Sequence, residues 1–372
     1  MIEHLGPPYA VAGLSGHSQG TKLLEQVKRH RPAAVAVTDE ATAEQVAPDV
    51  AAAGATLYRG PSGLVQMVQR EDVDIVLAAI VGAAGLPAVL QAVQSGKTIA
   101  LANKEALVVA GSLLVPEARR RGVSLLPVDS EHSAIFQAML AGRRDEVRRV
   151  ILTASGGPFR TWDADRIAHA TVEEALAHPT WNMGGKITID SATMFNKGLE
   201  LIEACWLFDL PPSMVEIVIH PESIVHSMVE FVDGSVLAQL SPPDMKTPIQ
   251  YALTYPNRRN DIIRRLDLTE AFSLHFEPPD PEKFPALRLA YDVAEMGGTA
   301  GAVMNAANEV AVSAFLAGNI AFGEIWRVVG GTISRHRLQP QPSLDDLLEA
   351  DRWARQTATE AIKEIRQQAS AI

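Results

Sequence analysis

Residues 98–110, Thr-Ile-Ala-Leu-Ala-Asn-Lys-Glu-Ala-Leu-Val-Val-Ala, decide the fold of the N-terminal third of the chain. An apolar run over 98–102 ends in the polar residues Asn103 and Lys104, and a helical pattern follows over 105–121. A strand that leads directly into a helix predicts a crossover unit of a parallel sheet. Ligands bind at the carboxyl edge of such sheets, so Lys104 is a candidate for a substrate contact. The alternative is that Asn103 or its neighbour only caps the helix.

The same alternation continues on both sides of this stretch. Strands are predicted at 9–14, 33–37, 74–81 and 124–128, and helices at 21–29, 41–53 and 86–94. This pattern favours an α/β fold in which residues 1–128 form a doubly wound, Rossmann-like parallel sheet.

The rest of the chain changes character twice. Residues 129–254 contain strand-like runs and a turn at Val232-Asp233-Gly234-Ser235, which predicts an α+β domain. Residues 255–285 carry five prolines, a composition typical of a linker. Residues 286–372 are rich in alanine with helical periodicity, which predicts a C-terminal helical bundle.

Composition excludes several classes of protein. The chain has 372 residues and a formal net charge of −11, which argues against a general nucleic-acid binder, since such proteins need a basic face. The single cysteine, Cys205, allows no intramolecular disulfide and fits a reducing compartment; we read it as a core residue and not as a nucleophile. No apolar run reaches the length of a membrane span. We therefore expect a cytoplasmic protein that acts on a small molecule.

Three carboxylates are candidates for a metal site. Asp129 and Glu131 follow the predicted strand 124–128, and residues two apart on a strand project to the same side. Mg²⁺ and Mn²⁺ prefer such oxygen ligands, and Glu200 is a candidate for the third carboxylate. The alternative is a pair of ordinary solvated acids and a capped helix start.

Polar residues suited to a phosphate cluster in two further segments. Ser191, Asn196 and Lys197 precede Glu200 and supply hydrogen-bond donors and a point charge. The run Ser155-Gly-Gly-Pro158 exposes backbone amides after a strand, although most such turns are only turns.

The segment from His178 to Lys186 is typical of a lid over a pocket. It combines His178 and Trp181 with the flexible pair Gly184-Gly185. The alternative is a surface loop whose Trp181 plugs the edge of the core. Two minor candidates lie downstream. His226 is an isolated histidine, and such residues are more often structural than catalytic. Met245 lies in a proline-rich loop and is a candidate for a pocket wall.

The order and spacing of these motifs resemble the 1-deoxy-D-xylulose 5-phosphate reductoisomerase family. The resemblance runs from about Tyr9 to the C-terminus. Its blocks lie at 101–107, 127–137, 152–159, 178–203, 219–228, 240–249 and 255–258. It implies metal-dependent rearrangement of 1-deoxy-D-xylulose 5-phosphate and its NADPH-dependent reduction to 2-C-methyl-D-erythritol 4-phosphate, in a homodimer.

The resemblance also implies a role for each matching position. The metal ligands, for Mg²⁺ or Mn²⁺, are Asp129, Glu131 and Glu200. The substrate contacts are Lys104, Ser130, Glu131, Ser155, His178, Ser191, Asn196, Lys197, Glu200 and Met245. The residues expected to act in catalysis are Lys104, Glu131, His178, Trp181 and His226. The NADPH contacts are Asn103, Glu105 and Gly184, together with His17, Ser18 and Gln19 in the loop that contacts the adenosine ribose in the family.

One part of the family pattern is missing from this sequence. The family opens with a strand and a loop like Gly-Ser-Thr-Gly-Ser-Ile-Gly, whose amides approach the cofactor pyrophosphate. Nothing similar precedes Tyr9, and the loop 13–20 does not have that spacing. We therefore expect the N-terminal sheet to lack its first strand and the natural chain to start upstream of Met1.

Two alternatives remain open from the sequence. One is a truncated, inactive paralogue that binds metal and sugar phosphate without NADPH turnover. The other is a different NAD(P)-dependent dehydrogenase of sugar phosphates, whose activity would not need a metal.

Overall fold

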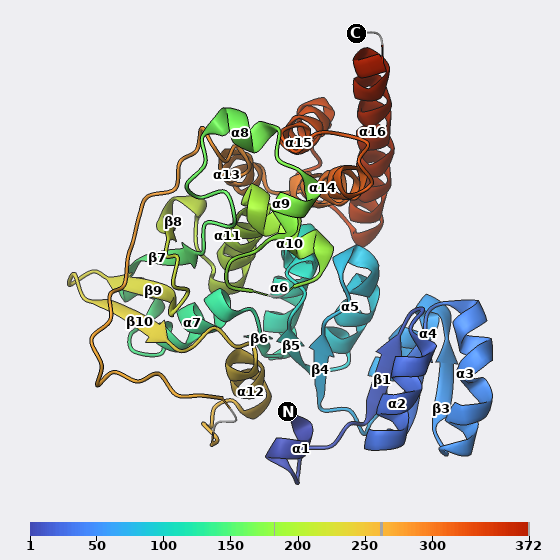
Figure 1. Cartoon of the computed structure of the whole chain (residues 1–372). Coiled ribbons are helices and arrows are strands. Elements are labelled where there is room, and N and C mark those ends of the chain that lie inside the picture. Colours follow the sequence, from blue (N-terminus) through green and yellow to red (C-terminus); the bar gives the residue numbers. More distant parts are fainter. Residues whose placement is uncertain (182, 261–262, 371–372) are drawn as a thin grey trace. The chain divides into compact units, whose positions relative to one another are not determined.

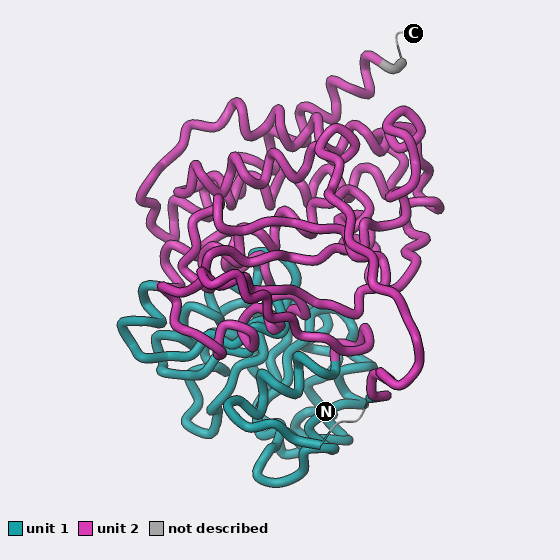
Figure 2. Tube along the Cα trace, turned by 90° about the vertical axis from the view of Figure 1, so that its left-hand side faces the viewer, with its two compact units in different colours: residues 1–103, 116–128, 246–263 teal, residues 104–115, 129–245, 264–372 magenta. Residues whose placement is uncertain are grey.

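The computed structural model describes residues 1–181, 183–260 and 263–370 of an α/β protein (Figure 1). The chain divides into two compact units, shown in different colours in Figure 2. Unit 1 comprises residues 1–103, 116–128 and 246–263, and unit 2 comprises residues 104–115, 129–245 and 264–372.

Unit 1 contains two three-stranded sheets in which every strand pair is parallel. The first has the order β1-β2-β3 and the second the order β4-β5-β6. The strands are β1 (Gly13–Gly16), β2 (Ala34–Val37), β3 (Thr56–Arg59), β4 (Ile75–Ala78), β5 (Thr98–Leu101) and β6 (Leu125–Pro127). The parallel pairing predicted from the strand–helix alternation is thereby confirmed, but the strands form two sheets where a single sheet was predicted.

The helices of unit 1 are α1 (Ile2–Leu5), α2 (Gly20–His30), α3 (Glu40–Ala52), α4 (Gly60–Val68), α5 (Leu86–Gln94) and α12 (Lys246–Thr254), with the 3-10 turn η1 (Gly82–Gly85). Most of these helices follow one of the strands of unit 1 in sequence; α1 precedes them, and α12 comes from a later part of the chain. Strand β2 is fully buried, and its valines pack with Leu23 and Val27 of α2 and with α3. This packing explains the strong apolar stripe of α2.

The predicted strand at 9–14 was wrong in its start. The ladder begins at Gly13, which lies opposite Ala34 of β2, so Tyr9 to Ala12 precede it. An apolar run shows that a segment suits a strand, but only the partner strand fixes where pairing begins.

Helix α6 (Glu105–Arg121) passes from unit 2 into unit 1 after Val115. Its backbone leaves helical geometry at Ala110, with φ −132°, and it contains Pro116. A proline removes the hydrogen bond to the carbonyl four residues earlier, here that of Ser112, so Pro116 adds a second irregularity after the one at Ala110.

Unit 2 is built on a mixed four-stranded sheet with the order β10-β9-β7-β8. Its strands are β7 (Val147–Ala154), β8 (Val215–Ile219), β9 (Val225–Phe231) and β10 (Val236–Leu240). Strands β7 and β8 are parallel, and the other two pairs are antiparallel. The predicted turn joins β9 to β10, with Gly234 at φ 87°.

Helices of unit 2 surround this sheet. The helices between residues 130 and 208 are α7 (Ser130–Met139), α8 (Ala164–Ala168), α9 (Val172–Leu176), α10 (Gly185–Thr193) and α11 (Phe195–Phe208). Short 3-10 turns are η2 (Arg144–Glu146) and η3 (Pro212–Met214). The C-terminal helices are α13 (Ala286–Met296), α14 (Ala300–Leu316), α15 (Glu324–Arg335) and α16 (Leu344–Ser370).

One hydrophobic core joins the sheet of unit 2 to its C-terminal helices. Phe322 lies at the centre of an aromatic group, with ring centroids 5.0 Å from Phe159 and 5.4 Å from Trp326 in edge-on geometry. Such edge-on pairs add to the stabilisation from burial alone. Among the described residues, no helix is both long and apolar enough to cross a membrane.

Candidate active site

Three carboxylates of unit 2, two at the start of one helix and one inside another, converge. Asp129 is the N-cap residue of α7, Glu131 lies in the first turn of α7, and Glu200 lies within α11. One oxygen from each lies within 4.8 Å of the other two. The three predicted metal ligands are therefore brought together, and Glu200 is only 1 % exposed.

The reason given for Asp129 and Glu131 facing the same way was wrong. The strand β6 ends at Pro127, and helix α7 begins at Ser130. The two carboxylates meet because they flank the start of a helix, not because they alternate along a strand. Likewise, α11 begins at Phe195, so Glu200 lies well inside the helix and not at its start.

Two lysine ammonium groups lie among these carboxylates. Lys104 Nζ is 2.6 Å from Asp129 Oδ2 and 2.9 Å from Glu200 Oε1. Lys197 Nζ is 3.0 Å from Glu131 Oε1 and also contacts Glu200 Oε2. Both lysines are buried. Charged groups are tolerated in such an interior only when they are paired, and here each ammonium contacts two carboxylates.

The electrostatics of the cluster follow from burial and pairing. Burial disfavours charged Lys104, but Asp129 and Glu200 overcome it and raise its pKa well above the ordinary value. Burial also opposes charge on Glu131, yet Lys197 lowers the pKa of that carboxyl to about 2. Burial and the neighbouring Glu131 raise the pKa of Glu200. The lysines therefore stay charged, and Glu131 is an anion.

Two more predicted residues join the cluster through hydrogen bonds. Ser130 Oγ donates to Glu131 Oε2 at 2.6 Å. Asn196 accepts from Lys104 Nζ at 2.8 Å and donates to Glu200 Oε1 at 2.6 Å. Six predicted site residues from 104 to 200 are thus linked to one another directly, with Ser130 attached at the edge.

A second group of predicted residues surrounds His178. Its Nδ1 accepts hydrogen bonds from the backbone amides of Thr180 and Trp181, at 3.1 and 2.9 Å. Nε2 therefore carries the proton and donates to Ser155 Oγ at 3.1 Å. Burial lowers the pKa of His178, which favours this neutral form. The histidine ties the start of the predicted lid to the turn after β7; Asn182, in the same segment, is outside the described residues.

The turn after β7 requires its glycines. Gly156 and Gly157 have φ values of 82° and 64°, in the left-handed region. A Cβ on Gly157 would lie 2.8 Å from the carbonyl oxygen of Ser191. This close approach places the backbone of Ser191 beside the turn that carries Ser155, so two of the predicted phosphate contacts are neighbours.

The two minor candidates have different surroundings. His226 on β9 is 5 % exposed, and its Nε2 lies 2.9 Å from Ser241 Oγ and 3.1 Å from the Ser241 carbonyl oxygen. Burial lowers the pKa of His226, so it is a neutral, hydrogen-bonded residue. Met245 is half-buried, at the end of the loop that follows β10.

The predicted cofactor contacts are divided between the two units. His17, Ser18 and Gln19 lie between β1 and α2 in unit 1, and His17 Nδ1 is 2.8 Å from Thr38 Oγ1. Asn103, after β5, donates to the carbonyl oxygens of Ile80 and Gly82, both also in unit 1. In unit 2, Gly184 is the N-cap residue of α10.

Glu105, the remaining predicted cofactor contact, belongs to a second buried charge group in unit 2. Its Oε1 lies 3.6 Å from Lys186 Nζ, which is 2.6 Å from Asp190 Oδ2. Asp190 also accepts a hydrogen bond from Asn308 at 2.8 Å. Glu105 is therefore held by the helix that follows the predicted lid.

Two buried residues beside the cluster were given no role in the site by the sequence analysis. His132 and Glu203 each place a ligand atom within 4.8 Å of one from Asp129. His132 directly follows Glu131, and Glu203 lies one helical turn after Glu200. His132 lies three residues after Asp129 and Glu203 three residues after Glu200, a spacing that places each on the side of that carboxylate, but nothing local showed that both are buried.

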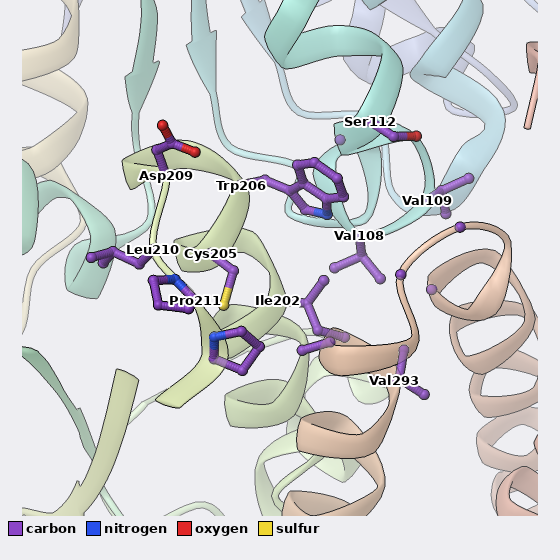
Figure 3. A pocket seen from close by; sticks show the side chains of 16 residues that line it. Val108, Val109, Ser112, Ile202, Cys205, Trp206, Asp209, Leu210, Pro211 and Val293 are labelled. Carbon is purple, nitrogen blue, oxygen red and sulfur yellow. The ribbon is translucent and has the colours of Figure 1, made fainter. Parts of the chain in front are cut away.

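A cavity of about 370 Å³ lies elsewhere in unit 2 (Figure 3). Ile202, Cys205 and Trp206 of α11 line it, and Val108 of α6 faces them. Burial raises the pKa of the Cys205 thiol to about 12, and the residue packs against the core, as the sequence suggested. The cavity shares helix α11 with the carboxylate cluster but none of its residues.

Family models match most of this sequence. The model described as 1-deoxy-D-xylulose 5-phosphate reductoisomerase matches residues 1–111. Its C-terminal domain model matches residues 125–208, and a further model, DXP reductoisomerase C-terminal domain, matches residues 240–357. These segments contain nearly all of the residues described above.

Curated relatives cover almost the whole chain. The 1-deoxy-D-xylulose 5-phosphate reductoisomerase of Endomicrobium trichonymphae is 51 % identical over 367 residues, 98 % of this chain and 95 % of the relative. The protein of the same name from Prosthecochloris aestuarii is 50 % identical over 350 residues, 94 % of this chain and 92 % of the relative.

Solved structures agree in fold. The Zymomonas mobilis reductoisomerase in complex with NADPH has a TM-score of 0.89 at 44 % identity, covering 95 % of this chain and 92 % of that one. A DOX-P reductoisomerase in complex with NADPH, fosmidomycin and magnesium has a TM-score of 0.91 at 42 % identity, covering 98 % and 95 %. With half of its residues identical over nearly its full length, the chain belongs to the 1-deoxy-D-xylulose 5-phosphate reductoisomerase family.

Proposed function

We propose that the buried cluster of carboxylates and lysines in unit 2 is where this enzyme converts 1-deoxy-D-xylulose 5-phosphate to 2-C-methyl-D-erythritol 4-phosphate. The observation that carries the proposal is the convergence of Asp129, Glu131 and Glu200 within 4.8 Å. The contacts of Lys104 and Lys197 with the same carboxylates support it. This grouping of opposite charges in a protein interior is costly and is characteristic of functional sites.

The cluster fits a divalent cation. All three carboxylates offer oxygen atoms, which Mg²⁺ and Mn²⁺ prefer. Three carboxylate charges face two ammonium charges, so the group retains negative charge that a cation would offset. The relative crystallised with magnesium and the family membership support the same assignment.

The protein's own residues set up the reaction around that cation. A bound divalent cation supplies Lewis acidity toward the substrate's ketone and hydroxyl oxygens, and NADPH supplies the hydride for the reduction. Lys104, fixed at the start of α6, holds a proton that it can donate to a substrate oxygen. Glu131, kept anionic by Lys197, and Ser130 orient the same end of the substrate.

The phosphate of the substrate is assigned to the other side of the site. Ser155, Ser191, Asn196 and Lys197 supply hydroxyl, amide and ammonium donors for it. The close approach of Gly157 to Ser191 supports a single pocket for the two serines. Binding energy from the phosphate, remote from the reacting carbons, is then available to close the lid.

His178 and Trp181 form the closing part of the site in this proposal. The neutral His178 fixes the backbone of the lid start, and Gly184 and Gly185 give the segment freedom at its other end. Trp181 then covers the substrate and excludes water, which protects the aldehyde formed by the rearrangement. Met245 forms part of the pocket wall, and His226 acts in catalysis from its buried position on β9.

The cofactor contacts are proposed for NADPH. Asn103, Glu105 and Gly184 would approach its nicotinamide half, and His17, Ser18 and Gln19 its adenosine ribose. We further propose that β1-β2-β3 and β4-β5-β6 are halves of one doubly wound sheet, joined in the family by a strand between β1 and β4. Leu77 on β4, 48 % exposed, is an apolar residue such a strand would cover.

A homodimer is proposed as the working assembly. β10 is an edge strand of its sheet, and it exposes Val236, Leu237 and Leu240. Long apolar edges are normally covered, here by a second copy of the chain. Light scattering of the purified protein tests this; Leu237→Lys is expected to shift the mass to that of a monomer.

The organisation of the chain is proposed as a cofactor domain at 1–128, a catalytic domain at 129–254, a linker at 255–285 and a helical domain at 286–372. A cytoplasmic location is also proposed, and fractionation of cells that make the tagged protein would test it.

The deciding experiment is NADPH consumption by the purified chain with 1-deoxy-D-xylulose 5-phosphate and Mn²⁺. Turnover that stops with a chelator is expected and rules out both an inactive paralogue and a metal-independent dehydrogenase. A folded chain without turnover would contradict the proposal for this chain. Recovery of turnover on adding the family's first strand and glycine loop would then assign the defect to the cofactor sheet.

A further inference from the structure

Behind the carboxylate cluster lies a buried pair that no ligand in the proposal contacts. His132 on α7 is 0 % exposed and Glu203 on α11 is 1 % exposed. His132 Nδ1 lies 3.4 Å from Glu203 Oε2. A histidine and a glutamate are rarely fully buried without a task, because each gives up its hydration.

The hydrogen-bonding roles of His132 follow from its surroundings. Nε2 lies 2.8 Å from the backbone carbonyl oxygen of Glu200. A carbonyl can only accept, so Nε2 carries a hydrogen and donates it. The other ring nitrogen, Nδ1, then faces the carboxylate of Glu203. One of these two groups must carry a hydrogen, because otherwise a lone pair of the nitrogen would face a lone pair of the oxygen. Among the described residues, His132 Nδ1 and both oxygens of Glu203 have no hydrogen-bond partner, so their 3.4 Å approach is the polar contact that each offers the other.

These contacts join the two helices that carry all three proposed metal ligands. Asp129 and Glu131 flank the start of α7, and Glu200 belongs to α11, 69 residues after Glu131 in the sequence. Another link between the helices, from Lys197 to Glu131, uses a residue assigned to the substrate. His132 contacts the backbone carbonyl of Glu200 and the carboxylate of Glu203, and neither group is assigned to the substrate, so these contacts can persist while substrate binds and leaves.

We propose that His132 and Glu203 are positioning residues that hold α7 and α11 in register, so that the three carboxylates stay at coordination distance in the absence of ligand. The inference rests on the proposed metal site. Outer contacts of this kind orient metal ligands elsewhere, and their loss typically weakens metal binding by about 10–100-fold.

The test measures Mn²⁺ binding by electron paramagnetic resonance, on the full chain without substrate or NADPH. Glu203→Met removes the polar contact with His132 and the charge, at similar side-chain length. Glu203→Gln removes only the charge, since its amide can still donate to His132 Nδ1. Glu230→Met is the matched control, because Glu230 is a buried glutamate of the same unit that pairs with Arg148 and Arg149 in the sheet.

The expected result is a dissociation constant raised about 10–100-fold in Glu203→Met, and within about twofold of wild type in Glu203→Gln and in the control. In turnover assays, Glu203→Met should need more Mn²⁺ for half-maximal rate while kcat at saturating Mn²⁺ is retained. A purely structural role would lower the melting temperature without this selective shift in Mn²⁺ affinity.

Distinct outcomes separate the two claims. If wild-type protein does not bind Mn²⁺, the proposed metal site fails and the inference fails with it. If wild type binds and Glu203→Met binds equally well, the inference alone is wrong. If Glu203→Gln is as weak as Glu203→Met, the charge of Glu203 acts through space and positioning is refuted. Should Glu203→Met not fold, His132→Phe, which can keep the stacking on Phe208, replaces it with the same expectation.

Discussion

The ammonium of Lys197 links two helices by contacting a carboxylate on each, Glu131 on α7 at 3.0 Å and Glu200 on α11. The group that we assign to the substrate phosphate therefore also neutralises two proposed metal ligands. Substrate and cation each compete with contacts already present in the protein, and the energy of binding includes their rearrangement. Because the roles of these residues overlap, single substitutions are needed to separate them.

Glu200→Gln should abolish tight cation binding. The change removes one of three carboxylates and keeps the shape of the side chain. Loss of an outer contact weakens metal binding by about 10–100-fold, so loss of a ligand should cost roughly 100-fold or more, with NADPH oxidation falling accordingly. Mn²⁺ titration and initial rates measure both effects. Glu216→Gln, whose carboxylate pairs with Arg149 in the sheet, is the control, and unchanged Mn²⁺ affinity in Glu200→Gln would refute the site.

Lys104→Met and Lys197→Met should separate catalysis from substrate binding. Lys104→Met is expected to lower kcat by about 10²–10³-fold, the usual cost of losing one donor to developing charge. Lys197→Met is expected chiefly to raise KM, because a phosphate contact is lost. Both should bind Mn²⁺ at least as well as wild type, since a competing ammonium is gone. A loss of Mn²⁺ affinity in either variant would show that the lysines support the cation site and do not compete with it.

Gly301→Ala should destabilise unit 2. A Cβ at Gly301 in α14 would lie 2.1 Å from the backbone oxygen of Val108, and a backbone atom cannot move aside cheaply. Overpacking costs about 1–3 kcal/mol of unfolding free energy. Gly331→Ala is the matched control, because that glycine lies in helix α15 with open space around it. It should stabilise by about 0.4–1 kcal/mol. Urea denaturation measures the free energy of unfolding of both variants. Equal changes in the two variants would contradict the close packing of Gly301 against Val108.

Cys205 should resist alkylation in the folded protein. Burial raises its pKa to about 12, so at pH 8 its thiolate fraction is about 1,000-fold below that of an ordinary thiol. Iodoacetamide labelling followed by mass spectrometry measures the rate, and no other cysteine interferes. The same chain in guanidinium chloride provides the reference. Equal rates before and after denaturation would mean that the thiol is accessible in the cavity wall.

Stability should depend on pH through His178. Burial lowers its folded pKa below the unfolded value of about 6.5, so the unfolded chain takes up the proton first. The stability that depends on neutral His178 is therefore complete above about pH 6.5, and it is lost as the pH falls through the pKa of His178 in the folded protein. Between pH 7.5 and 5.5, wild type should lose about 1–2 °C more in melting temperature than His178→Gln, since the histidine is only half-buried. If wild type and His178→Gln lost the same melting temperature between these pH values, His178 would not be the cause of the pH dependence.

The sequence predicted the type of the fold well because strand and helix patterns are local. Lys104 between β5 and α6, and Ser155 after β7, were placed correctly for this reason. The ends of elements were predicted less well, as the start of β1 shows, because pairing with β2 sets that end. The division of the N-terminal strands into two sheets also depends on pairing and has no local signal.

The candidate site was predicted from residue types, but its inner layer was not. Carboxylates and lysines suit a cation and a phosphate wherever they occur, so Glu131 and Glu200 could be recognised. His132 and Glu203 could not, because their importance lies in a contact between segments 71 residues apart. Burial and partnership of that kind arise only when the helices pack.

The division of the chain into two units also bears on how this protein can be inherited. The chain passes between the units after Asn103, Val115, Val128, Met245 and Ile263 (Figure 2). Two of these passages directly precede Lys104 and Asp129. A gene exchange that replaced one unit as a single block would have to rejoin the coding sequence at every passage. The two units are therefore expected to descend together.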